Sequence, residues 1–420
     1  MKINFLARIK NNRLVKGSFI LLIGSLIVNI SNYLFHFFMG RMLGPSDYGV
    51  LAALLSVLYL VSVFSSTLLT VTTKFTADFF SAGDFGKIHL LIKRLSRKFF
   101  WAGLAVFLIF LLAARFIANF LKIDSPSLVI IIGAFSLLLF LISLNRGVIQ
   151  GLQKFSHLAI NLSIEALLKL VLAIIFVILG GKVFGPVAAI FLACLFAYLI
   201  SFVPLKFLFK KTLQPIDKKK LILYSLPTLF IMLFLVSLYN ADIILVKHFF
   251  SAREAGLYAA LSTLGKIVLF ASGAITQAMF PIAAYLARRK KDPSRILKQT
   301  IILTSLISLV ILILYFVFPK YLVMILFGGQ YLEISSYLFF FGLVFSLFSI
   351  ISIFISFFLA IHKLRFVYFL GLAALAEIVL IIFFHQSILE IISILFIVMV
   401  ILLVGLIIYY RSLALNGQTR

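Results

Sequence analysis

Charged residues are scarce in this sequence, and acidic residues are the scarcest. Only 12% of the 420 residues are charged, and 12 Asp and Glu accompany 38 Lys and Arg. An ordinary soluble domain is about a quarter charged. Hydrophobic residues make up 64% of the chain, and the mean hydropathy is +1.23. The shortage of charge therefore excludes a soluble protein and indicates a chain that is solvated by lipid.

Cysteine and the common catalytic motifs are also missing. The one cysteine, Cys194, lies in an apolar run, so the chain can build neither a disulfide framework nor a cysteine-based metal site. The six histidines are scattered, and no HExxH, GxSxG or Walker motif occurs. We therefore expect a protein that is not an enzyme, with no catalytic residue, no bound metal and no cofactor.

Long apolar stretches separated by short polar breaks recur through the chain. A helical span needs ~20 apolar residues to cross the bilayer core. We therefore predict an all-α integral membrane protein of about twelve transmembrane helices. The predicted spans are residues 17–39, 48–72, 99–119, 127–150, 159–179, 186–208, 221–245, 257–280, 299–318, 334–358, 364–384 and 388–410.

The net charge of +26 follows this topology. With both termini in the cytoplasm, the inside segments hold 29 of the 38 Lys and Arg, which is a strong positive-inside pattern. Topology and contact with anionic membrane lipids explain this charge, so we expect no nucleic-acid partner.

An internal repeat divides the chain into two halves. GRMLGPSDYGVLAALLSVL is echoed by KHFFSAREAGLYAALSTLG at an offset of 207 residues, which aligns Gly49 with Gly256. NFLKIDSPSL and ILFGGQYLEISSYL form a second echo, in equivalent outer loops. Duplicated halves of six spans predict two pseudo-symmetric six-helix lobes around a central cavity, an arrangement typical of transporters.

The expected domain boundaries follow from the spans and the basic segments. We predict a basic cytoplasmic or interfacial arm at 1–16, an N-terminal lobe at 17–208, a basic cytoplasmic linker at 209–220, a C-terminal lobe at 221–410 and a cytoplasmic tail at 411–420.

Polar side chains recur on one face of spans one, two and eight. Ser and Thr at such positions are common in helix packing, whereas Asn, His and Lys are bulky and suit the lining of a cavity. We therefore predict that a substrate cavity is lined by Asn29, Asn32, His36, Tyr59, Lys74, Lys266 and Gln277.

Ionisable residues inside the spans are candidates for function because a charge in the bilayer is costly. Lys266 lies ~14 Å deep in span eight, near the midplane, and Lys169 reaches a similar depth in span five. Glu165 precedes Lys169 by four residues, the favourable spacing for an ion pair. Glu377 is either protonated, paired across helices or a coupling site. Asp242 either pairs with Lys247 or lines the outer mouth.

Three segments carry a resemblance to a known family. They are GRMLGPSDYGV at the end of span one, NADIILVKHFFSAREAGLYAALSTLGKIV around spans seven and eight, and FGGQYLEISS after span nine. In this order the chain resembles, over essentially its whole length, the polysaccharide or O-antigen flippases of the multidrug, oligosaccharidyl-lipid and polysaccharide exporter superfamily. Members often place arginine in the cavity, whereas span one here offers only Asn and His.

The resemblance implies a flippase that moves a polyprenyl-diphosphate-linked oligosaccharide from the inner to the outer leaflet by alternating access, for cell-surface polysaccharide biosynthesis. It also implies a bacterial or archaeal plasma membrane, and a polysaccharide polymerase or glycosyltransferases as partners. A Lys can stabilise a diphosphate as a point charge. We expect Lys266 to bind the diphosphate and Lys74 to guide it at the inner mouth. The membrane potential or an ion gradient would supply the energy, with His36, Glu165 or Glu377 as candidate proton sites.

Two alternatives remain open at this point. One is a cation-coupled drug or organic-cation antiporter of the same superfamily, which would need a carboxylate in the cavity. The other is a lipid-dependent assembly partner with no transport of its own.

Overall fold

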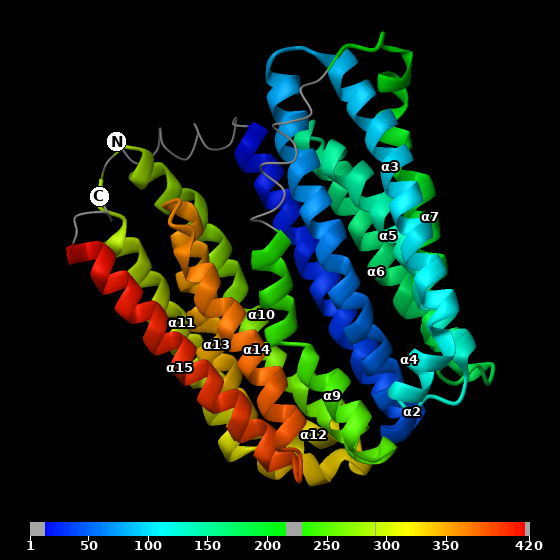
Figure 1. The fold of residues 1–420 in the computed structure, drawn as a ribbon, viewed down its shortest axis with the longest axis vertical. Coiled ribbons are helices and arrows are strands. Elements are labelled where there is room, and N and C mark those ends of the chain that lie inside the picture. Colours follow the sequence, from blue (N-terminus) through cyan, green and yellow to red (C-terminus); the bar gives the residue numbers. More distant parts are fainter. Residues whose placement is uncertain (1–12, 216–228, 290, 416–420) are drawn as a thin grey trace. The chain divides into compact units, whose positions relative to one another are not determined.

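The structure, a computed structural model, describes residues 13–215, 229–289 and 291–415. Every regular element in these ranges is a helix, which confirms the prediction of an all-α fold. The chain packs as two compact units (Figure 1). Unit 1 comprises Met1–Leu43 and Leu54–Leu233, and unit 2 comprises Gly44–Ala53 and Phe234–Arg420.

Unit 1 is built from most of the long helix α2 and the elements that follow it. Helix α3 packs on α5, α5 packs on α7, and α6 packs on α7. Figure 1 shows these helices as long rods, as expected from apolar runs that exceed the thickness of the bilayer core. The elements are α2 (Arg13–Ser81), α3 (Phe85–Leu112), α4 (Ala114–Phe120), α5 (Pro126–Gly151), α6 (Phe155–Ile178), α7 (Phe184–Ser201) and η1 (Val203–Lys210).

Helix α2 contains a sharp reversal at Gly44, where φ is 74° and ψ is 173°, a backbone conformation that favours glycine. A Cβ atom at Gly24 would lie 2.8 Å from the Cβ of Ala159. A Cβ atom at Gly151 would lie 2.5 Å from the Cβ of Thr76. Gly151 and Ala159 flank the short turn between α5 and α6, so they lie at the same end of unit 1. Their contact residues, Thr76 and Gly24, therefore lie at that end too. The two parts of α2 therefore run in opposite directions and contain predicted spans one and two.

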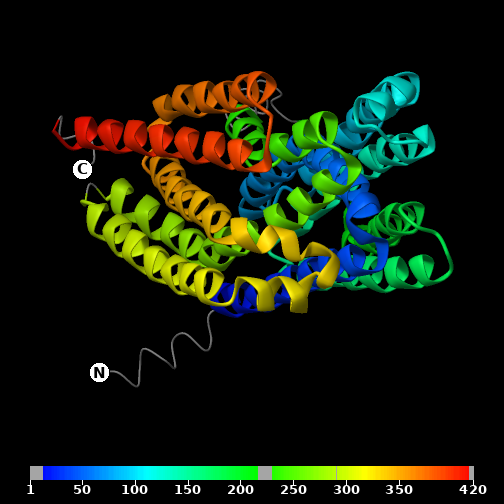
Figure 2. The same ribbon diagram turned by 90° about the horizontal axis from the view of Figure 1, so that it is seen from below.

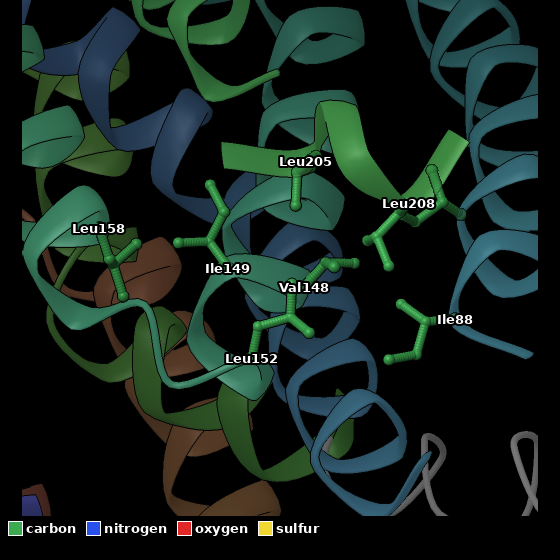
Figure 3. Close-up of a cluster of buried hydrophobic side chains, with 8 residues drawn as sticks. Ile88, Val148, Ile149, Leu152, Leu158, Leu205 and Leu208 are labelled. Atoms are coloured by element: carbon green, nitrogen blue, oxygen red, sulfur yellow. The ribbon is translucent and has the colours of Figure 1, made fainter. Parts of the chain in front are cut away.

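Small residues allow the second part of α2 to approach α5 closely. A Cβ atom at Gly147 would lie 2.8 Å from the Cβ of Thr72, one turn away from the contact between Gly151 and Thr76. Glycines four residues apart are a common way for membrane helices to pack without a hydrophobic driving force. At the same end of unit 1, an apolar cluster joins α3, α5, α6 and η1 (Figure 3). The cluster consists of Ile88, Ile92, Val148, Ile149, Leu152, Leu158, Leu205 and Leu208.

Unit 2 is organised around α13, which packs against α10, α11 and α15. Helix α14 packs against α15 and α9, and both Figure 1 and Figure 2 show α14 (orange) alongside α15 (red). Before α9, the helical segment Leu229–Leu238 meets α9 at a bend of 45°. The elements are α9 (Ala241–Phe249), α10 (Ala252–Arg288), α11 (Ser294–Val317), α12 (Pro319–Leu326), η2 (Gly329–Tyr337), α13 (Leu338–Ala360), η3 (Leu364–Phe366), α14 (Val367–Phe383) and α15 (Ile388–Leu415).

The order of elements repeats along the chain. The second part of α2 and the helices α3 to α7 correspond to α10 and the helices α11 to α15. The short helices α4 and α12 fall at or beside the outer loops whose sequences echo each other. This repeated order confirms the prediction of two pseudo-symmetric halves.

The two aligned repeat motifs pack directly against each other within unit 2. A Cβ atom at Gly49 would lie 2.7 Å from the backbone nitrogen of Gly256, and one at Gly256 would lie 1.6 Å from the carbonyl oxygen of Pro45. The hydroxyl groups of Tyr48 and Thr263 are 3.0 Å apart, within hydrogen-bonding distance. Both glycines are therefore required by the close approach of the α2 and α10 backbones.

The number of spans agrees with the prediction. Ten helices in the described ranges are long and apolar enough to cross a membrane, and the bent pair formed by Leu229–Leu238 and α9 makes an eleventh. One of the ten is the long segment Ile23–Ser81, which contains two predicted spans. Counting these separately gives the expected total of about twelve.

The predicted domain boundaries stay predictions. Much of the expected arm, part of the linker and half of the tail lie outside the described residues, at 1–12, 216–228 and 416–420.

Candidate functional site

Unit 1 holds one ammonium group deep between α6 and the first part of α2. Lys169 Nζ of α6 donates a hydrogen bond to Asn32 Oδ1 at 2.5 Å. The same nitrogen lies 4.8 Å from the ring centroid of Phe35. An amide oxygen and an aromatic face both stabilise a cation while adding no negative charge. Neither of these two partners neutralises an ammonium charge on Lys169.

Glu165 has a second partner besides the one expected. Its carboxylate forms an ion pair with Arg146 of α5, a contact between helices, and it also interacts electrostatically with Lys169 on its own helix. Arg146 Nε also donates to Asn161 Oδ1 at 2.8 Å, and Asn161 Nδ2 donates to the carbonyl oxygen of Ala197 at 2.7 Å. The sequence alone did not indicate Arg146 as a partner of Glu165, because Arg146 lies 19 residues earlier, on another helix.

Unit 2 holds a second ammonium group in a similar setting. Lys266 Nζ of α10 donates a hydrogen bond to Asn240 Oδ1 at 3.2 Å, and it lies 5.6 Å from the ring centroid of Tyr239. Asn240 is fully buried. Each unit therefore stabilises one lysine with an amide and an aromatic ring from a single neighbouring segment.

The segments that carry the partners of the two lysines are related by the sequence repeat. An offset of 207 residues places Tyr239 on Asn32 and Asn240 on Tyr33, so the same pair of residue types occurs in reversed order. Sequence reasoning missed Tyr239 and Asn240, although extending the repeat backward from Gly40 would have pointed to them.

Two buried carboxylates lie near Lys266 in unit 2. The Tyr258 hydroxyl donates a hydrogen bond to Asp242 Oδ2 at 2.6 Å. Asp242 interacts electrostatically with both Lys266 and Glu377. The other oxygen of Asp242 and both oxygens of Glu377 are buried with no hydrogen-bond partner in the described part of the chain. Since buried polar atoms are normally paired, these three oxygens are suited to receive a proton or a small cation.

The remaining predicted cavity residues occupy more open positions in unit 1. Asn29 is exposed and His36 is half-buried on the face of α2 that carries Asn32. Tyr59 is 40% exposed, and Lys74 is exposed, with its Nζ 5.8 Å from the ring of Phe75. The side chain of Gln277 lies outside the described part of the structure.

Comparisons with known proteins agree with this architecture. Residues 38–336 match the model of a family described as polysaccharide biosynthesis protein. A comparison with curated protein sequences finds no match.

Solved structures of transporters share the fold. An inward-facing multidrug resistance MATE family transporter of the MOP superfamily aligns with a TM-score of 0.77 at 14% identity, over 93% of this chain and 94% of the other. The lipid II flippase MurJ in an inward closed conformation aligns with a TM-score of 0.74 at 15% identity, over 93% and 87%. A MOP superfamily transporter from Pyrococcus furiosus aligns with a TM-score of 0.67 at 13% identity, over 96% of each chain.

The family match covers more than half of the chain, and the structural likeness covers nearly all of it. The chain therefore belongs to the family of polysaccharide biosynthesis proteins, and it is a multi-pass membrane protein with the fold of MOP-superfamily transporters.

Proposed function

We propose that the chain is a flippase that moves a polyprenyl-diphosphate-linked oligosaccharide from the inner to the outer leaflet of a bacterial or archaeal plasma membrane. The observation that carries the proposal is a half-buried ammonium group in each unit, Lys169 and Lys266, whose hydrogen-bond acceptors are neutral amide oxygens. A diphosphate brings about two negative charges to the bilayer, and a lysine stabilises such charge without a fixed geometry. The family description and the fold support the same class of substrate.

The direction of transport rests on the predicted topology, with both termini in the cytoplasm. Alternating access of the two units would expose the diphosphate first to one side and then to the other. The lipid tail would remain in the bilayer throughout. A polysaccharide polymerase or glycosyltransferases would then act on the delivered sugar.

Coupling to an ion gradient is the second part of the proposal. Asp242 and Glu377 are the best-placed groups, because three of their oxygens are buried without a hydrogen-bond partner in the described ranges. Glu165 is less suited because Arg146 already neutralises it. Binding of a proton or a small cation at the carboxylates would compensate negative charge close to Lys266.

A flipping assay on the purified full chain in proteoliposomes tests the substrate class. The assay follows the protection of a polyprenyl-diphosphate sugar from a membrane-impermeant reagent, with protein-free liposomes as the control. We expect protection to depend on the protein. Transport of a cationic dye in place of the lipid-linked sugar would instead support the antiporter alternative.

A further inference from the structure

A basic pocket lies at one end of unit 2, where the turn before α14 meets the end of α15. Its volume is about 310 Å³, which falls at the small end of the ~300–1,000 Å³ typical of ligand sites. His362, Lys363 and Arg365 line it from the turn, and Tyr409 and Ser412 line it from α15. It is separate from Lys266, so it has no part in the mechanism proposed above.

The chemistry of the lining selects a negatively charged ligand. Lys363 and Arg365 are cationic, and no carboxylate lines the pocket. The Tyr409 and Ser412 hydroxyl groups add neutral polar atoms. Arg guanidinium and Lys ammonium groups together with hydroxyls are a common donor set for phosphate oxygens.

An exposed apolar face of α14 begins one helical turn after Leu364 of the pocket. Leu364 and Leu413 complete the lining of the pocket. Along α14, Tyr368, Leu372 and Leu375 are 76%, 68% and 60% exposed, and their spacing of four and three residues puts them on one face of the helix. A ligand with a charged head and long acyl chains would contact both the basic pocket and the apolar face of α14, whereas free inorganic phosphate would contact only the basic pocket.

We propose that this pocket binds the phosphate headgroup of an anionic membrane phospholipid, with the acyl chains lying along α14. By the predicted topology, the turn and the end of α15 are cytoplasmic, so the lipid belongs to the inner leaflet. Basic pockets between helices at the cytoplasmic surface are a known means of binding anionic headgroups. The bound lipid would fix the end of α15 against the turn that begins α14.

Native mass spectrometry of the delipidated full chain tests this proposal. Phosphatidylglycerol and phosphatidylcholine with identical acyl chains are titrated separately, and inorganic phosphate is added as a competitor. The pocket variant is Lys363→Gln with Arg365→Gln. The control variant is Lys298→Gln with Arg411→Gln, which removes two exposed charges at the same end of unit 2, outside the pocket.

We expect the wild type and the control variant to bind one phosphatidylglycerol in preference to phosphatidylcholine. The pocket variant should bind it about 25-fold more weakly, because each basic side chain near an anionic headgroup contributes roughly fivefold. Lys363→Gln and Arg365→Gln alone should each weaken binding about fivefold, and these single variants carry the test if the double variant does not fold.

Three results would overturn the proposal. Equal binding of the two phospholipids would mean that the headgroup charge is not recognised. Equal weakening in the pocket and control variants would mean that the effect comes from overall surface charge. Displacement by inorganic phosphate at concentrations comparable to the lipid would assign the pocket to a free anion.

Discussion

Lys169 and Lys266 are kept inside apolar units by neutral neighbours and not by tight carboxylate pairs. A lysine at the bilayer centre costs about 2.5–3.5 kcal/mol on insertion scales. One hydrogen bond to an amide and one aromatic contact offset only part of that cost, about 0.5–2 kcal/mol for the aromatic contact. The residual cost favours the arrival of a negatively charged group, which supports the proposal that these two lysines bind substrate.

Because Arg146 and Glu165 form an ion pair, we expect Arg146→Met alone to destabilise the protein more than Arg146→Met combined with Glu165→Gln. Arg146→Met should lower the free energy of unfolding by about 1–3 kcal/mol, because it leaves the half-buried carboxylate of Glu165 without its ion-pair partner. Adding Glu165→Gln should restore most of the loss, because the unpaired charge is then removed.

Thermal unfolding in detergent measures this effect. Arg115→Met, which alters an exposed arginine of α4, serves as the control and should leave the midpoint unchanged. A double variant as unstable as Arg146→Met alone would show that Arg146 acts through something other than Glu165.

The carboxylates near Lys266 make a prediction about the driving force. In proteoliposomes, an imposed proton or sodium gradient should accelerate flipping by the wild type. Glu377→Gln and Asp242→Asn should abolish this acceleration while the rate without a gradient changes by less than about threefold, because the neutral forms mimic the cation-bound state.

The control for the coupling prediction is Asp124→Asn, an exposed carboxylate in unit 1. It should respond to the gradient as the wild type does. If Glu377→Gln and Asp242→Asn respond as strongly as the wild type, the coupling group lies elsewhere.

At the scale of helices, the contact between α2 and α10 depends on two glycines aligned by the repeat. Gly256→Ala should destabilise unit 2 by about 1–3 kcal/mol, because the new methyl group would overlap the backbone of α2. Gly273 lies on the same helix with nothing within 4 Å of its Cβ position.

Gly273→Ala should therefore be neutral or slightly stabilising, by up to about 1 kcal/mol from helix propensity. The midpoints of thermal unfolding of the two alanine variants distinguish the effect of close backbone packing at Gly256 from the effect of helix propensity at Gly273. Equal midpoints for both variants would show that the close approach of α2 and α10 does not contribute to stability.

The repeat was visible in sequence because it is carried by glycine and small residues that close packing requires. Sequence could not show that the two copies touch, since an alignment relates positions without placing them in space. Sequence separated spans one and two, at 17–39 and 48–72, but it did not identify the residue at which the backbone reverses. Only the conformation at Gly44 marks the reversal.

At the scale of the whole chain, apolar runs and the distribution of basic residues were enough to predict an all-α membrane fold with two related halves. Those signals are strong because the bilayer core offers no water to bond with the backbone, so each span must be a helix that satisfies its own backbone hydrogen bonds. The site was only partly predictable. Lys266 and Lys169 stood out as buried charges, whereas their partners Asn240 and Asn32 are 26 and 137 residues away in the chain.

The most direct test of the central claim compares wild type, Lys266→Ala and Lys266→Arg in the proteoliposome flipping assay. Lys320→Ala, an exposed lysine of α12 in the same unit, is the matched control. We predict that Lys266→Ala lowers the flipping rate by on the order of tenfold or more, the expected cost of losing a charge-assisted contact to diphosphate. Lys266→Arg should retain part of the rate, and Lys320→Ala all of it. Wild-type flipping by Lys266→Ala would contradict the account.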